Sequence, residues 1–286
     1  MVVHKVEMFE NLGFFIAKRW IAGPSISDAV RVTKRVNSSG VRAILNYLGE
    51  ELTDAGEIRR NVEMYFQLMD EIRSDGLDAD VSLKPTQIGL SVSYDLAKEN
   101  YAQILRYAKV NDVFVWLDME ASRYVEPTIR LYLEGLTITR EGIAIQSYLR
   151  RSNEDVKEIV KRGGVIRLVK GAYKEPPDIA YIKWKDKTEN YRVIMKYLFE
   201  NANEFTIATH DTRIVREAVE MNGTYGRDVT VAMLLGIKNR FLYGLQGQPV
   251  RRALYIPYGE KWLDYARRRL KEASNLILVL RSLFEL

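Results

Sequence analysis

The sequence contains no cysteine and only two histidines, His4 and His210, among its 286 residues. The absence of cysteine excludes disulfides, thiolate catalysis and iron–sulfur clusters, and two histidines argue against a zinc site. No stretch approaches the roughly 20 apolar residues that a membrane-spanning helix needs. The N-terminal residues include acids and lack a cleavage site after a long apolar core, so no secretory signal is predicted and the cytoplasm is the expected compartment.

Several common ligand-binding and catalytic motifs are also missing. We find neither the GxGxxG nor the GxxxxGK[ST] phosphate loop, and neither HExxH nor GxSxG. A nucleotide cofactor would therefore not be held by a Rossmann turn. Lys and Arg exceed Asp and Glu by 43 to 38, but the excess is spread along the chain, without a basic block or an RNA-binding aromatic signature. This distribution does not predict nucleic-acid binding, and it favours anionic ligands only weakly.

What the sequence does contain is a repeated alternation of apolar and helical segments. Near-continuous apolar runs, typical of strands buried on both faces, occupy residues 41–49, 78–85, 113–119, 141–149, 165–171, 205–211, 228–236 and 251–259. Segments with helical spacing lie between them, with Thr53 or Asp54 and Asp211 as expected N-caps. Eight strand–helix units predict an α/β fold, a (β/α)8 barrel.

The chain has no linker or internal repeat, so we expect a single domain over residues 1–286. Residues 1–40 are predicted to form extra N-terminal helices that cover a barrel end. Residues 41–275 would form the barrel and its last helix, and residues 276–286 a short apolar helix. That terminal helix is expected to pack on the barrel, with docking on a membrane surface as the alternative.

The fifth apolar run, VIRLVKGAY over residues 165–173, carries two cations, Arg167 and Lys170. A buried unpaired charge is costly, so either this strand is an edge washed by water or an anionic group lies beside it. Other runs also end in polar residues, namely Lys84, Asp118, Glu120, Gln146, Arg150, Arg151, Thr209, His210, Asp211 and Tyr255. In a barrel these strand ends meet at one mouth, where catalysis occurs, so the pattern favours an anionic ligand.

The last predicted helix carries a second group of charges. Tyr265, Arg268, Arg269 and Glu272 follow the spacing i, i+3, i+4 and i+7, which places them on one helical face. Paired arginines can clamp a carboxylate by bidentate hydrogen bonds. The alternative is a solvated basic helix with an internal Arg–Glu pair.

The residues alone leave the chemistry open. Lys84 or Lys170 could form a Schiff base, as in an aldolase-type barrel enzyme, or act as a simple countercharge. A further hypothesis is that the chain is a basic barrel that binds RNA or acidic lipid without catalysing a reaction.

Taken in order, the strand-end motifs resemble those of the proline dehydrogenase family. The resemblance rests on VSLKP with TQIGL, WLDME, IQSYLRRS, RLVKGAY, ATHD, MLLG, YIPYG and the YARRRLKE helix, and it runs from about residue 41 to residue 275. It implies a distorted (β/α)8 barrel that binds FAD noncovalently. The implied reaction is oxidation of L-proline to Δ1-pyrroline-5-carboxylate, in which hydride passes from C5 to flavin N5 and the electrons pass on to a quinone. This is the first step of proline catabolism to glutamate, and it leaves open a peripheral contact with the inner face of the membrane.

The resemblance also implies roles for individual residues. Arg167 matches the arginine near flavin N5, and the other cofactor contacts match Leu117, Gln146, Val169, Lys170, Gly171, Ala172, Thr209 and His210. Glu272 is assigned to the cofactor site and to orienting the arginines. Lys84, Arg268 and Arg269 match the groups that hold the proline carboxylate, with Asp118 beside the ring and Tyr255 and Leu234 as pocket walls. Asp118, Arg167 and Lys84 are thus the expected catalytic residues.

Two features bear on how closely the site follows the family. Before MLLG the family has glutamate and glutamine, whereas this chain has Thr230 and Ala232, so one flavin contact is expected to be missing. Tyr255 leaves little room for a 4-hydroxyl group on the substrate ring, and we therefore expect proline to be preferred over hydroxyproline.

Overall fold

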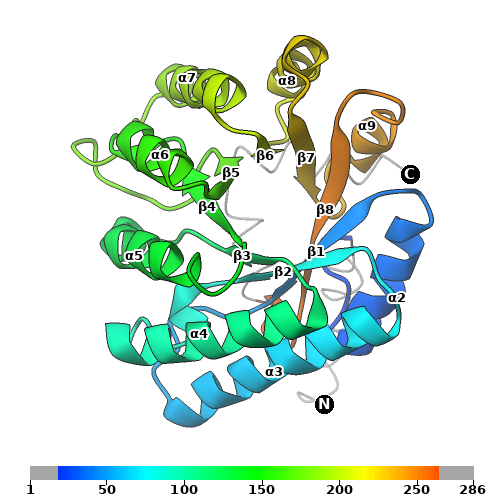
Figure 1. The fold of residues 1–286 in the computed structure, drawn as a ribbon, viewed down its shortest axis with the longest axis vertical. Coiled ribbons are helices and arrows are strands. Elements are labelled where there is room, and N and C mark those ends of the chain that lie inside the picture. The colour runs from blue at the N-terminus through cyan, green and yellow to red at the C-terminus, as the bar shows by residue number, and fades with distance from the viewer. Residues whose placement is uncertain (1–18, 264–286) are drawn as a thin grey trace, which may run out of the picture.

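A computed structural model of the chain describes residues 19–263, and their strands form a closed barrel. Its eight parallel strands are arranged in sequential order, each paired with the next and β8 with β1 (Figure 1). The strands are β1 Arg42–Tyr47, β2 Ala79–Leu83, β3 Val115–Leu117, β4 Gly142–Gln146, β5 Val165–Val169, β6 Glu204–Ala208, β7 Asp228–Leu234 and β8 Arg251–Tyr258. Each overlaps one predicted apolar run, and the (β/α)8 prediction is confirmed.

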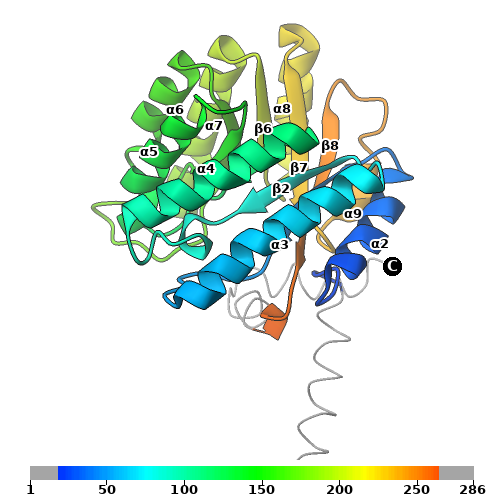
Figure 2. The same ribbon diagram turned by 60° about the horizontal axis from the view of Figure 1, so that its bottom comes forward.

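The helices surround the strands (Figure 1). They are α2 Ile26–Asn37, α3 Ala55–Ser74, α4 Tyr94–Asn111, α5 Val125–Gly135, α6 Ser152–Lys161, α7 Trp184–Asn201, α8 Thr212–Tyr225 and α9 Asn239–Tyr243, with short 3₁₀ turns at Pro85–Gln87 and Ser122–Tyr124. Figure 2 shows α3 and α4 side by side along one flank of the barrel. Two expected N-caps are confirmed, because the Asp54 and Asp211 carboxylates accept backbone N–H bonds at the starts of α3 and α8.

The N-terminal segment was expected to cover a barrel end, and its described part does more than that. Helix α2 takes a place in the ring of helices and contacts β1 and β8 (Figure 1). Just before it, Trp20 and Ile21 pack with Leu48 and Ile237, which follow the ends of β1 and β7. The segment therefore lines the side of the barrel with one part and its C-terminal mouth with another.

The barrel interior is filled differently from the layer under the helices. The outer layer holds most of the branched aliphatic and aromatic side chains. The apolar residues that cluster inside the barrel are Ile44, Trp116, Val165, Ala232 and Ala253, and the two alanines among them are small. Small residues leave room in the interior for larger polar side chains such as Arg167. Across residues 19–263 we find no helix that is both long and apolar enough to cross a membrane.

Candidate active site

Arg167 lies on β5, and only 3% of its surface is exposed. Its guanidinium forms an ion pair with Asp118, which follows β3, and donates a 3.1 Å hydrogen bond to the Ser82 hydroxyl on β2. Strand β5 is therefore not an edge strand exposed to water. The anionic group beside Arg167 is the Asp118 carboxylate of the protein itself. The other terminal nitrogen, Nη1, is buried and has no hydrogen-bond partner among the described residues.

Asp118 joins three strands at the mouth of the barrel. Its Oδ1 accepts from Arg167 and, at 3.0 Å, from Ser82, while its Oδ2 accepts from the Tyr255 hydroxyl of β8 at 2.8 Å. The Arg167 guanidinium lies over the Tyr255 ring, 5.4 Å from its centroid. With donors on both oxygens, the Asp118 carboxylate is held in one orientation and is suited to fixing a cation rather than to accepting a substrate proton.

Lys84, directly after β2, is partly buried, and its ammonium forms no ion pair with any residue in the described range 19–263. The buried Glu120 carboxylate accepts bonds from the backbone and hydroxyl of Thr86 at 3.0 and 2.7 Å. Burial raises the pKa of Glu120, and the positive charge of Lys84 opposes that rise. The Gln146 side chain donates to the Glu120 backbone carbonyl at 2.9 Å. Lys84 is thus left as a cation that could bind an external carboxylate.

The ends of β5 and β6 are joined by a second ion pair. The Lys170 ammonium contacts the Asp211 carboxylate at 3.2 Å and lies 5.1 Å from the centre of the Trp184 ring. Burial lowers the pKa of Lys170, whereas Asp211 acts to raise it. The Thr209 hydroxyl accepts a 3.2 Å bond from the Asp211 backbone. These contacts fix the turn between β6 and α8, where cofactor contacts were predicted.

His210 is fixed by β7 and the turn that follows it. Its Nε2 accepts a 3.0 Å hydrogen bond from the Leu234 backbone N–H, so this nitrogen carries no proton. The Lys238 ammonium donates to the His210 carbonyl at 2.9 Å. Leu234 is the register partner of Tyr255, so two predicted pocket walls lie on adjacent strands.

Gly171 is required by the turn after β5. Its φ is +104°, and a Cβ at this position would lie 2.1 Å from the Tyr148 ring. We expect Gly171→Ala to destabilise the fold by about 3 kcal/mol, because backbone strain and overlap with a buried ring act together. Gly226→Ala is the matched control, since Gly226 has φ +61° but open space around its Cβ, and it should cost about 1 kcal/mol. Urea unfolding measures both values, and equal losses would contradict the steric argument.

The remaining strand-end and predicted site residues differ in their surroundings. Arg150 donates to the Pro177 carbonyl at 3.0 Å, and Arg151 pairs with Glu126 and Asp155, so both serve local structure. The Leu117 side chain is fully buried in the layer under the helices, which leaves only its backbone for a cofactor. Val169 is the last residue of β5 and is partly buried. Ala172, three residues later, is exposed. Arg268, Arg269, Glu272 and the adjacent Tyr265 fall outside the described residues.

Two residues of this cluster were not predicted. Ser82 and Trp116 are register partners on β2 and β3, and both contact Arg167. The sequence could have indicated both residues, because Ser82 lies two residues before Lys84 and Trp116 lies two residues before Asp118. Alternate residues of a strand face the same side.

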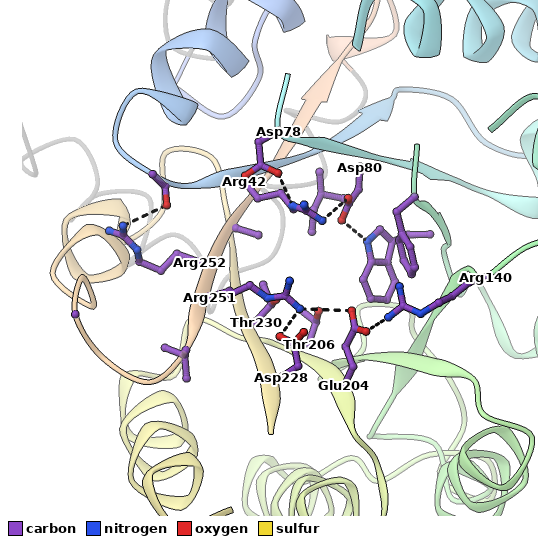
Figure 3. A pocket seen from close by; sticks show the side chains of 17 residues that line it. Arg42, Asp78, Asp80, Arg140, Glu204, Thr206, Asp228, Thr230, Arg251 and Arg252 are labelled. Carbon is purple, nitrogen blue, oxygen red and sulfur yellow. Dashed lines mark hydrogen bonds and ion pairs between the residues drawn. The ribbon is translucent and has the colours of Figure 1, made fainter. Parts of the chain in front are cut away.

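The opposite, N-terminal end of the barrel holds a cavity of about 630 Å³ lined by charged side chains (Figure 3). Arg42 pairs with Asp78 and Asp80 at 2.7 and 3.1 Å. Glu204 pairs with Arg140 and Arg251, and Arg251 also with Asp228. These three arginines already have carboxylate partners within the chain, so their charge is balanced internally rather than offered to a ligand. No group of three or more potential metal ligands occurs within residues 19–263.

Comparison with known proteins identifies the family. The sequence pattern of the family described as proline dehydrogenase matches residues 29–276. The chain is 32% identical to proline dehydrogenase 1 of Bacillus subtilis subsp. natto, covering 94% of this chain and 91% of that protein. It is 31% identical to a proline dehydrogenase of Deinococcus radiodurans, with coverages of 91% and 87%.

A solved structure shares the fold. It is proline utilization A from Bdellovibrio bacteriovorus inactivated by N-propargylglycine, which superposes with a TM-score of 0.86 at 24% identity. The match covers 95% of this chain but only 34% of that protein. The match to the family pattern and the identity to its members over nearly their whole length show that this chain belongs to the proline dehydrogenase family of oxidoreductases.

Proposed function

We propose that this enzyme oxidises L-proline to Δ1-pyrroline-5-carboxylate with noncovalently bound FAD, at the C-terminal mouth of the barrel, and that a quinone accepts the electrons. The observation that carries the proposal is the Arg167–Asp118–Tyr255 cluster, a buried cation held by a carboxylate and flanked by an aromatic ring. The quinone, and any contact with a membrane, rest on the family resemblance alone.

The residues at this mouth fit a flavin. The buried Nη1 of Arg167 has no described partner, and such a donor can bind an electron-rich ring edge. Lys170, Gly171, Thr209, His210 and Gln146 would hold the remainder of the cofactor. Ala232 lies inside the barrel and presents no polar group, in keeping with the expected missing contact. When bound, FAD would supply the two-electron acceptor for proline oxidation.

The chain's own groups would bind and orient the substrate. Lys84 would bind the proline carboxylate together with Arg268 and Arg269. The hydrogen bond from Tyr255 to Asp118 holds the phenol ring in a fixed position, where it forms one wall of the pocket. Asp118 acts by holding Arg167 and Tyr255, since both of its oxygens already accept bonds.

An anaerobic visible spectrum of the purified protein, before and after addition of L-proline, tests the proposal. We expect flavin bands that bleach with proline and return when a quinone analogue is added. Flavin bands that do not change when proline is added would contradict the assignment of L-proline as the substrate. A protein that stays colourless after addition of FAD, and that is labelled at Lys84 or Lys170 by borohydride with a carbonyl substrate, would support the Schiff-base alternative instead.

Lys84→Met should raise the KM for proline about tenfold to 100-fold, because it removes a charged hydrogen bond to the carboxylate. Flavin content should remain unchanged. Lys98→Met is the matched control, because Lys98 pairs with Glu134 on the helical surface. Steady-state kinetics with both variants decide the point, and an unchanged KM in Lys84→Met would remove Lys84 from the carboxylate site.

The position of Tyr255 gives a prediction about specificity. Because its hydroxyl is bonded to Asp118, the ring cannot swing aside without breaking a 2.8 Å hydrogen bond. We expect kcat/KM for trans-4-hydroxyproline to be lower than that for L-proline by about tenfold or more. Comparable values for the two substrates would contradict the assignment of Tyr255 as a wall beside the ring.

A further inference from the structure

The Arg167 guanidinium contacts a second aromatic ring besides Tyr255, the indole of Trp116. The centre of the guanidinium lies 5.0 Å from the ring centroid, within the range of a cation–π interaction, and tryptophan is the strongest partner for it. Trp116 and Arg167 are only 4% and 3% exposed. The interaction is therefore shielded from water, which strengthens it.

The indole is in turn held by Asp80. The Trp116 ring N–H donates a 2.9 Å hydrogen bond to Oδ2 of Asp80, and the other oxygen accepts from Arg42 at 3.1 Å. Figure 3 shows Asp80 beside Arg42 among the side chains that line the N-terminal cavity. A carboxylate bonded to the indole N–H fixes the ring plane and increases the electron density of the ring, which favours a cation over its face.

The barrel register explains why these groups meet. Asp80 and Ser82 alternate on β2, while Trp116 and Asp118 have the same two-residue spacing on β3 and beyond it. Arg167 reaches them from β5 and contacts Ser82, Trp116 and Asp118 together. Because Ser82 and Trp116 are register partners, Arg167 contacts a pair of adjacent strand residues together with Asp118, the residue that follows β3.

We propose that Trp116 and Asp80 are positioning residues for the reaction, which hold the Arg167 guanidinium in the orientation in which it faces the flavin and Asp118. This inference rests on the proposed role of Arg167 at the cofactor. It connects the ion pairs at the N-terminal end of the barrel to the active site through contacts that run from Arg42 to Asp80, then to Trp116 and Arg167.

The test uses the full-length, flavin-loaded enzyme and measures the rate of flavin reduction at saturating proline, the flavin midpoint potential and the affinity for FAD. Trp116→Leu removes the ring, Trp116→Phe keeps a ring but removes the N–H bond, and Asp80→Asn keeps an acceptor but removes the charge. Arg42 keeps Asp78 as a partner in Asp80→Asn. Thr230→Val is the control, because Thr230 lines the same cavity and no hydrogen bond links it to these residues.

We expect flavin reduction to slow about tenfold in Trp116→Leu and about threefold in Trp116→Phe and Asp80→Asn, with a shifted potential and little change in KM. Thr230→Val should match the wild type. Because Trp116 acts through Arg167, adding Trp116→Leu to Arg167→Met should slow reduction no further. A purely structural role would lower stability without changing the rate per bound flavin.

The outcomes separate this inference from the proposed function. If flavin reduction is slow in Arg167→Met but proceeds at the wild-type rate in the Trp116 and Asp80 variants, the positioning role is wrong and the proposed function stands. Additive effects of Trp116→Leu and Arg167→Met would also overturn the positioning role. If Arg167→Met itself reduces normally, the placement of Arg167 at the flavin fails first. Should Trp116→Leu not fold, Trp116→Phe and Asp80→Asn answer the same question.

Discussion

Replacing Arg167 by methionine should slow reduction of the flavin by proline about 100-fold or more, the largest kinetic effect that we expect from a single substitution. The reason is that a buried guanidinium at the mouth of the barrel provides positive charge where negative charge would develop on the reduced cofactor. Methionine fills a similar volume without the charge. Rapid-mixing measurements of flavin reduction at several proline concentrations give the rate and the KM separately.

The control for this experiment is Arg151→Met. Arg151 is also an arginine near the end of a strand, but it pairs with Glu126 and Asp155 on the side of α6. The flavin of Arg151→Met should be reduced by proline at the wild-type rate. Normal reduction kinetics in Arg167→Met would contradict the assignment of Arg167 to the cofactor, even though its ion pair with Asp118 would be lost.

The largest stability effect should come from Asp118→Asn. This change leaves the Arg167 charge, 3% exposed, without its counterion in the barrel interior. Breaking one side of a buried ion pair typically costs about 3 to 5 kcal/mol, much more than the net value of the pair itself. We expect a loss near the lower end, about 3 kcal/mol, because asparagine still offers an oxygen to the Ser82 hydroxyl. Chemical denaturation measures the difference.

A double variant separates charge from shape. In Asp118→Asn with Arg167→Met both charges are absent, so stability should recover by about 1 kcal/mol or more relative to Asp118→Asn alone. Glu158→Gln is the surface control, because Glu158 and its partner Arg162 are 51% and 59% exposed, and it should cost less than about 1 kcal/mol. If the double variant were less stable than Asp118→Asn alone, the buried charge would not be the cause of the loss.

Several parts of the site could be predicted from residue patterns. Lys84 and Asp118 directly follow β2 and β3, and Arg167 and Tyr255 are polar residues within the apolar runs of β5 and β8. Closure of a parallel barrel brings the carboxyl ends of these strands to one mouth. The same reasoning also pointed to Arg150 and Arg151, whose side chains bond to the Pro177 carbonyl and pair with Asp155. A residue beyond a strand end is no longer constrained by the alternation of the strand, so its direction depends on the local turn.

The sequence by itself determined the barrel, through eight apolar runs separated by amphipathic segments, and it indicated polar residues in or after several of those runs as candidates for the mouth. Only the tertiary structure decided that the anion beside Arg167 is Asp118, 49 residues earlier in the chain, and that Trp116 and Asp80 lie beneath it. The physical reason is that side-chain periodicity specifies which face of a strand is inward, whereas the partner across the barrel depends on the register of all eight strands together.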